Sequence, residues 1–204
     1  MELDFTLATQ AFVTLLVIMD PLGNVPVFLS LTGGMEQDAR RRVAAQAVIS
    51  ATAIVYLFAI FGSQILSYLS ISLEALQVAG GVMLFITALS MFRGELDDPD
   101  PEQGASVAVV PLGTPMVAGP GAIAAVMVFM AGDVGVGTRL ENQLSVVLAV
   151  TAALAVVYVA LRYGTWLERL LKDKGILLVT RVMGMLLLAI SVELIASGIT
   201  AYTA

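Results

Sequence analysis

One stretch of seven residues combines a carboxylate, two prolines and a glycine inside an otherwise apolar run: Asp20-Pro21-Leu22-Gly23-Asn24-Val25-Pro26. Pro21 cannot donate a backbone hydrogen bond to the carbonyl of Val17, and Pro26 cannot donate one to Leu22. A helix that enters this stretch is therefore expected to stop or unwind. In hydrocarbon, freed backbone groups are tolerated only where they face protein or a water-filled cavity. The stretch predicts a broken helix with an acid at the break, which is typical of a functional site.

Two acids are expected at membrane depth. Asp20 follows Phe5 by about 22 Å of helix, and Glu193 follows Arg181 by about 18 Å. An ionisable group at such depth is a candidate functional group. Asp20 could hold a substrate ammonium, carry a coupling proton, or cap the unwound segment, and these roles are compatible. Glu193, expected to be buried, could be a proton carrier or a polar contact between helices.

A second segment, from about Ser106 to Met130, is also broken by prolines, at Pro111, Pro115 and Pro120. Proline is favoured at the first position of a helix. We therefore expect Pro26 to start one half-helix, with Asn24 or Val25 as its cap, and Pro120 to start the other, with Gly119 as its cap. A helix N-terminus can hold a carboxylate, and the carbonyls that end the preceding half-helix suit an ammonium. The two breaks together fit a small zwitterion such as an amino acid.

The composition is that of an integral membrane protein. The 204 residues are 59% hydrophobic and 13% charged, against about 25% charged in soluble domains. At about 20 residues per span, the chain holds six spans and no soluble domain. It has no Cys and no His, so the sequence predicts no disulfide, haem or zinc site and no cofactor. The net charge of −6 argues against a nucleic-acid partner.

Six spans are expected, at about 5–31 (interrupted at 20–26), 43–66, 75–92, 106–130, 144–163 and 176–199. Residues 36–42 are expected to form a loop. Nine of the ten basic residues fall in the loops after spans 1, 3 and 5, and only Arg139 falls on the other side. Because cytoplasmic loops carry the excess of Lys and Arg, we expect both termini to be extracytoplasmic, in a multi-pass protein of the cell membrane.

The chain has an internal repeat. Pro21-Leu22-Gly23 recurs as Pro111-Leu112-Gly113, and the third and sixth spans share a pattern of small and apolar residues. Each half, 1–93 and 106–204, has three spans, so the second half enters from the opposite side. The sequence thus predicts an all-α, single transmembrane domain built as a 3+3 inverted repeat, with an acidic cytoplasmic linker at 94–105. Interrupted segments at matching positions of two halves are the best sequence indication of a transporter's binding site.

These segments resemble the MarC/SnatA family of integral membrane proteins over essentially the whole chain. The matching motifs are Asp20–Phe28, Gln77–Gly81, Val110–Pro115 with Ala118–Ile123, and Thr180–Gly184. The resemblance implies discontinuous first and fourth spans and transport of small neutral amino acids such as glycine and alanine. On this basis the expected substrate-binding residues are Asp20, Gly23, Asn24, Pro26, Thr114, Gly119, Pro120 and Gly121, with Asp20 and Glu193 as coupling-ion candidates.

Several alternatives stay open. The same scaffold could export drugs or other small metabolites, or serve as a non-transporting membrane scaffold. An intramembrane aspartyl protease needs two neighbouring aspartates, and only one is expected within the spans, so no enzyme activity is expected. The sequence does not choose between H⁺ and Na⁺ as the coupling cation, and it leaves a homodimer open.

Overall fold

The computed structural model describes residues 4–94, 117–131 and 139–203, and every regular element in these ranges is a helix. The all-α expectation is therefore confirmed for these ranges. The elements are α1 (Phe5–Met19), α2 (Asn24–Leu31), α3 (Gln37–Tyr68), α4 (Leu73–Arg93), α5 (Pro120–Ala131), α6 (Arg139–Arg162) and α7 (Gly164–Thr203).

Four helical segments are long and apolar enough to cross a membrane: α3, α4, residues 140–162 of α6 and residues 175–203 of α7. The pair α1 and α2 counts as a fifth span that is bent by 43° at its break. α5 is a shorter apolar helix. The part of the predicted fourth span that precedes it, including Pro111 and Pro115, lies outside the described residues, as does most of the 94–105 linker. The sixth span and the inverted repeat remain predictions.

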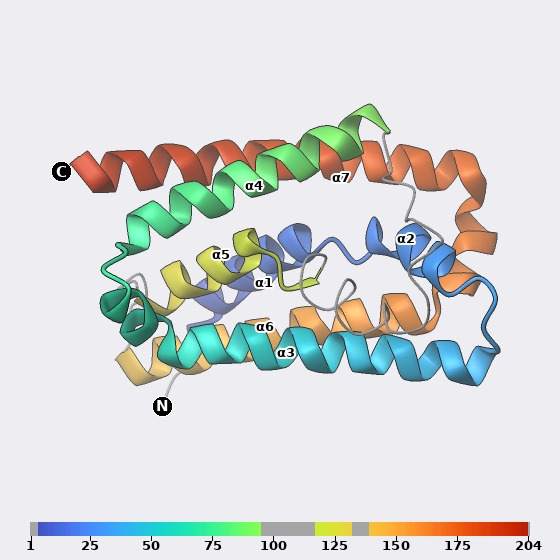
Figure 1. The fold of residues 1–204 in the computed structure, drawn as a ribbon, viewed down its shortest axis with the longest axis horizontal. Coiled ribbons are helices and arrows are strands. Elements are labelled where there is room, and N and C mark those ends of the chain that lie inside the picture. Colours follow the sequence, from blue (N-terminus) through green and yellow to red (C-terminus); the bar gives the residue numbers. More distant parts are fainter. Residues whose placement is uncertain (1–3, 95–116, 132–138, 204) are drawn as a thin grey trace.

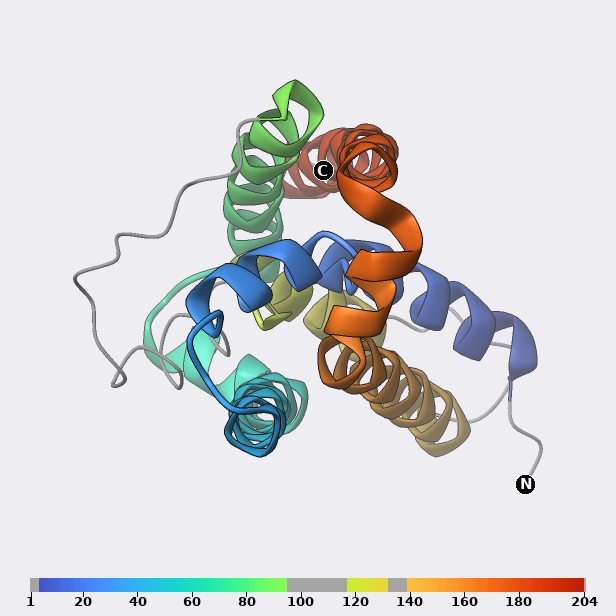
Figure 2. The same cartoon turned by 90° about the vertical axis from the view of Figure 1, so that its right-hand side faces the viewer.

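The helices lie in three layers (Figures 1 and 2). α4 and α7 form one outer layer, and α3 and α6 form the other. Between them lie α1, α2 and α5, so the broken segments occupy the middle of the molecule. In the α3–α6 layer, the Tyr56 hydroxyl is hydrogen-bonded to Thr151 Oγ1 at 2.6 Å and also donates to the carbonyl of Val147.

The chain passes back and forth along the long axis of the bundle (Figure 1). α1 begins and α7 ends at the same end of the molecule. α2 runs from the break toward the opposite end, and α5 runs from the centre back toward the end where α1 begins. The arginines of α3's first turns lie at the far end with the α6–α7 connection. This grouping is the one that the predicted topology requires; the orientation in a membrane stays a prediction.

α4 and α7 pack with their backbones in contact, because glycines face the partner helix. A Cβ placed on Gly81 would lie 3.1 Å from the carbonyl oxygen of Ser191, and one on Gly184 would lie 2.8 Å from the backbone nitrogen of Phe92. Gly198 meets the Glu74 carbonyl oxygen in the same way, at 3.1 Å. Small residues at such contacts are the usual means by which helices associate in a membrane. Gly81, Gly184 and Gly198 therefore let α4 and α7 approach each other closely.

Two expected boundaries differ from the structure. Residues 37–42 are not a loop but the first turns of α3, since Glu36 acts as the N-cap and the helix continues without interruption to Tyr68. At the other end of the chain, α7 starts as early as Gly164 and is broken at Lys172, whose φ of 54° lies in the left-handed region. The break separates a short arm, residues 164–171, from the long membrane-crossing part.

Candidate functional site

The break between α1 and α2 is centred on Asp20, which ends α1 in the left-handed conformation at φ 37° and ψ 70°. Its own N–H still bonds to the carbonyls of Leu16 and Val17, at 3.1 and 3.2 Å. Aspartate tolerates this conformation better than most non-glycine residues do. The following Pro21 prevents the helix from continuing, because its ring clashes with the preceding turn and it lacks an N–H.

Asp20 also caps the helical turn that follows. Its Oδ1 accepts a hydrogen bond from the Gly23 N–H at 3.0 Å, and its carbonyl accepts one from the Asn24 N–H at 3.1 Å. This is the pattern of an N-cap residue with proline at the first helical position. The cap role that the sequence analysis left open for Asp20 is therefore present. Its carboxylate makes no other hydrogen bond to a described residue, and the residue is only 5% exposed.

The expectation that Pro26 starts the second half-helix is wrong. α2 begins at Asn24, with Gly23 at the cap position. The tight turn that starts at Pro21 already sets the direction of the chain. Pro26 has no N–H to donate to the carbonyl of Leu22, and this carbonyl accepts a hydrogen bond from the Val25 N–H at 3.3 Å instead. Pro26 therefore fits within the first turn of α2.

Asn24 closes the other side of the break. Its Nδ2 donates to the carbonyl of Met19 at 2.8 Å, and both residues are buried. This carbonyl belongs to the last turn of α1 and has no partner within that helix. One side chain thus satisfies a freed N–H and another satisfies a freed carbonyl, which allows a non-helical backbone to lie inside the bundle.

Gly23 is required by space rather than by its backbone conformation, since its φ is −68°. A Cβ at this position would overlap the Asp20 carboxylate, and it would lie 2.8 Å from Cε of Met91 in α4. The carboxylate therefore lies folded over Gly23, and any side chain here would push it away.

The start of α5 has a different construction, and the part of the predicted second break before residue 117 lies outside the described residues. α5 begins at Pro120, and the Gly119 carbonyl accepts the first helical bond from the Ile123 N–H at 3.1 Å. The expectation that Pro120 starts this half-helix after Gly119 is confirmed. The N–H groups of Gly121 and Ala122 lie in the first turn, where no carbonyl of the same helix is available. Such N–H groups and the positive end of the helix dipole suit an anion. Thr114 lies outside the described residues.

α4 lies against both breaks. A Cβ on Gly80 would lie 2.9 Å from the Pro120 carbonyl oxygen, Leu84 faces Gly121, and Met91 covers Gly23. Leu84 and Met91 are seven residues apart, so the two breaks contact α4 at points separated by roughly 10 Å along its axis. The structure thus brings Asp20, Gly23 and Asn24 together at one break and Gly119, Pro120 and Gly121 at the other. Leu84 and Met91 were not among the predicted site residues, although the spacing of Gly80, Leu84, Ala88 and Met91 marks one face of a helix.

Glu193 does not lie at either break, and the expectation that it is a buried acid is wrong. It is exposed on α7 and accepts a hydrogen bond from Ser197 Oγ at 3.3 Å. The packed face of α7 carries Gly184, Leu187 and Ser191. Glu193 follows Ser191 by two residues, about 200° around the helix, so it points away from the bundle.

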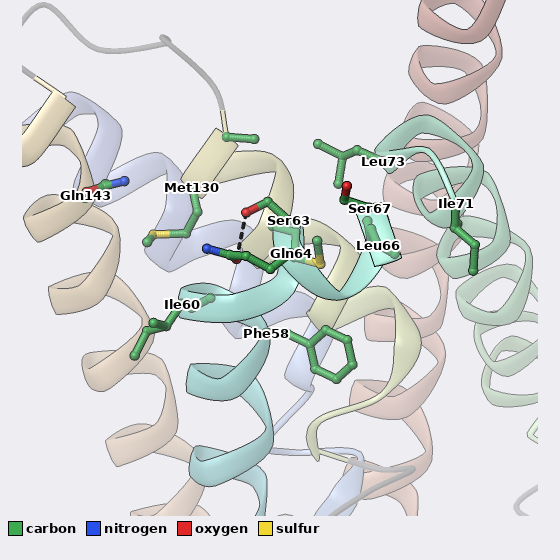
Figure 3. A pocket seen from close by; sticks show the side chains of 13 residues that line it. Phe58, Ile60, Ser63, Gln64, Leu66, Ser67, Ile71, Leu73, Met130 and Gln143 are labelled. Carbon is green, nitrogen blue, oxygen red and sulfur yellow. Dashed lines mark hydrogen bonds between the residues drawn. The ribbon is translucent and has the colours of Figure 1, made fainter. Parts of the chain in front are cut away.

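Among the cavities of the described residues, two are of interest here, and neither is lined by Asp20 or by the start of α5. Figure 3 shows one of about 460 Å³, where Ser63, Gln64 and Ser67 of α3 gather with Gln143 of α6 among apolar residues. Ser63 Oγ donates to Gln64 Oε1 at 2.9 Å. None of the predicted site residues lines this cavity. A second cavity of about 640 Å³ is lined by Pro26 and lies between α2, α3 and α7.

The comparisons with known proteins point to one family of integral membrane proteins. The family model described as "MarC family integral membrane protein" matches residues 5–203. The chain is 37% identical to "UPF0056 membrane protein MJ1677" of Methanocaldococcus jannaschii over 93% of this chain and 94% of the relative. It is 33% identical to "UPF0056 membrane protein YhcE" of Escherichia coli, over 96% and 93% of the two chains. It is 30% identical to "UPF0056 membrane protein YvbG" of Bacillus subtilis, over 96% and 95%.

No solved structure matches the chain. The match nevertheless extends over almost the whole length, including both breaks and the α4–α7 pair. The chain belongs to the MarC family of integral membrane proteins.

Proposed function

We propose that the chain is a secondary transporter that moves small neutral amino acids of the glycine and alanine type across the cell membrane. The observation that carries this proposal is the break at Asp20: a buried acid at the junction of two half-helices in the middle layer of the bundle. Buried acids and interrupted helices at such a place mark substrate and ion pathways in transporters.

The two breaks offer complementary groups to a zwitterion. The first turn of α5 provides the N–H groups of Gly121 and Ala122 for a carboxylate. The Asp20 carboxylate provides a counter-charge for an ammonium or for a coupling H⁺ or Na⁺. Glycine and alanine at positions 118, 119, 121 and 122 leave room for a small side chain only. We include Pro26 and Thr114 in the proposed pathway.

The proposed transporter has six spans in an inverted repeat, with both termini on the extracytoplasmic side. In support, α2 and α5 run from the centre to opposite ends of the bundle (Figure 1). The opposite directions are those that two half-helices related by an in-plane axis would have.

Counterflow of labelled alanine or glycine into vesicles that contain the purified protein tests the proposal. We expect labelled amino acid to enter only vesicles that contain unlabelled amino acid. In a separate assay, in which an H⁺ or Na⁺ gradient drives uptake, we expect uptake to stop when that gradient is reversed. The absence of counterflow with every small neutral amino acid, in both orientations, would sink the proposal. Export of drugs or other small metabolites, without amino-acid movement, would support the competing function.

A further inference from the structure

A cavity of about 640 Å³ opens at the end of the bundle where α2 ends, away from the Asp20 break. We call it the α2–α7 cavity. Its walls come from three elements: α2 and the turn after it, α3, and both arms of α7. Its lining includes Pro26 and two charged residues, Arg40 and Glu168.

The walls are held by close packing and by the break in α7. Gly164, at the start of the short arm, lies against α2, where a Cβ would be 3.3 Å from Cγ1 of Val25. The left-handed Lys172 then turns the chain, so that Glu168 of the short arm and Ile176 of the long arm face the same space. The shape of the cavity therefore depends on the way α7 turns beside α2.

Arg40 supplies a positive charge with an unused donor. Its Nη2 donates to the carbonyl of Thr32, the residue that ends α2, at 3.0 Å. Its Nε is buried and has no hydrogen-bond partner, and the same holds for the Nε of Arg41, which does not line the cavity. The feature that sets Arg40 apart is therefore the position of its positive charge at the cavity wall. A carboxylate is the acceptor that a guanidinium binds best.

Glu168 supplies a negative charge on the opposite wall. It is exposed on the short arm of α7, and it makes no hydrogen bond or ion pair with a described residue. Because no ion pair joins it to Arg40, the cavity presents one positive and one negative group that do not neutralise each other. A molecule that carries a carboxylate and an ammonium on the same carbon, as an α-amino acid does, has a charge opposite to each of the two groups.

We propose that the α2–α7 cavity is a second binding site for a zwitterionic amino acid, separate from the break, in which Arg40 holds the carboxylate and Glu168 holds the ammonium. This inference rests on the proposed transport function. Pro26 belongs to α2 and lines this cavity, so the cavity and the Asp20 break lie along the same half-helix. The site would hold the substrate as it enters or leaves at this end of the bundle. The headgroup of phosphatidylethanolamine, with a phosphate in place of the carboxylate, offers the same pair of opposite charges.

The test measures the half-saturation concentration for alanine at each face of the membrane, with right-side-out and inverted vesicles. Glu168→Gln and Arg40→Gln are each expected to raise the half-saturation concentration about tenfold at the face where α2 ends. Arg42→Gln and Arg169→Gln are matched controls, since both residues are exposed neighbours that do not line the cavity.

Glu168→Gln decides the result if Arg40→Gln fails to fold through loss of its bond to Thr32. An unchanged half-saturation concentration in Glu168→Gln, with active wild-type protein, overturns this inference and leaves the proposed function intact. A wild-type protein that moves no amino acid overturns both. Vesicles with and without phosphatidylethanolamine distinguish a free amino acid from a lipid headgroup as the occupant of the cavity. If the variants raise the half-saturation concentration only when this lipid is present, the cavity binds a headgroup and the inference is overturned.

Discussion

The α1–α2 break and the start of α5 both lie in the middle layer, and their helix ends are formed by different chemistry. At the α1–α2 break, two polar side chains satisfy the freed backbone: Asp20 accepts from Gly23, and Asn24 donates to Met19. At the start of α5, no polar side chain within residues 117–122 is available, and Pro120, Gly119 and close packing against α4 form the end of the helix. The first break satisfies its own backbone groups and carries a charge. At the start of α5, the N–H groups of Gly121 and Ala122 have no hydrogen bond to another described residue. The difference suggests a division of roles, with a cation or ammonium held at the first break and a carboxylate at the second.

The variant Asp20→Asn separates the charge from the cap and has the largest expected effect. An asparagine oxygen can still accept from the Gly23 N–H, and asparagine tolerates the left-handed conformation. We expect the thermal unfolding midpoint in detergent to stay nearly constant, while alanine counterflow falls at least about tenfold, equivalent to about 1.4 kcal/mol. Asp38→Asn, on the exposed start of α3, is the control. Unchanged counterflow in Asp20→Asn would make Asp20 a structural cap alone.

Gly23→Ala examines the packing of the same break. The new methyl group would overlap the Asp20 carboxylate, and overpacking of this kind costs about 1–3 kcal/mol. Thermal unfolding in detergent measures the loss. Gly34→Ala, where a Cβ would meet nothing within 4 Å, should be close to neutral. In an Asp20→Ala background the cost of Gly23→Ala should shrink, because the clashing group is gone; equal costs in both backgrounds would contradict the assigned contact.

A pair of glycines makes the matching test at the second break. Gly80→Ala would place a methyl group 2.9 Å from the Pro120 carbonyl oxygen, which is backbone and cannot move aside easily. We expect a loss of about 1–2 kcal/mol in unfolding free energy. Gly121→Ala meets Leu84 at an ordinary 3.4 Å, so its loss should stay below about 1 kcal/mol. The reverse order would show that α5 does not begin against Gly80.

Glu193→Gln has the smallest expected effect. The side chain is exposed and bonded only to Ser197, and a glutamine keeps an oxygen for that bond. Alanine counterflow and its dependence on the cation gradient should match wild type within about twofold, less than 0.5 kcal/mol. If this variant no longer responds to the cation gradient, Glu193 takes part in transport. Asp20 would then not be the acid that couples the cation gradient to amino-acid transport.

Local backbone chemistry made much of this fold predictable. The interruption at 20–26 and the helix start at Pro120 follow from the lack of a proline N–H, which acts within a few residues. The same reasoning placed the start of α2 at the wrong proline. Pro21 can also be a first helical residue, with Asp20 as its cap. The sequence does not indicate which of the two prolines has that role. Boundaries shift by a few residues for such reasons.

The rotation of a membrane helix about its axis was harder to predict. In α7 both the packed and the exposed faces are apolar, so hydropathy does not distinguish them, and Glu193 was assigned to the wrong side. The signal that does distinguish them is the position of small residues, Gly184 and Gly198, which lie on the packed face. The α2–α7 cavity was not predicted because it depends on the turn at Lys172, which has no proline or glycine to mark it.

The glycine-mediated contact between α4 and α7 also constrains the time at which the protein can assemble. Gly81 and its partner Ser191 are separated by more than half of the chain. At about 5–20 residues added per second, roughly 5–20 s pass between the synthesis of the two. During that time the glycine face of α4 has no α7 to pack against, and α4 must remain in the membrane as an independent helix. We therefore expect ribosome-bound chains that stop before α7 to leave this face accessible to other membrane proteins.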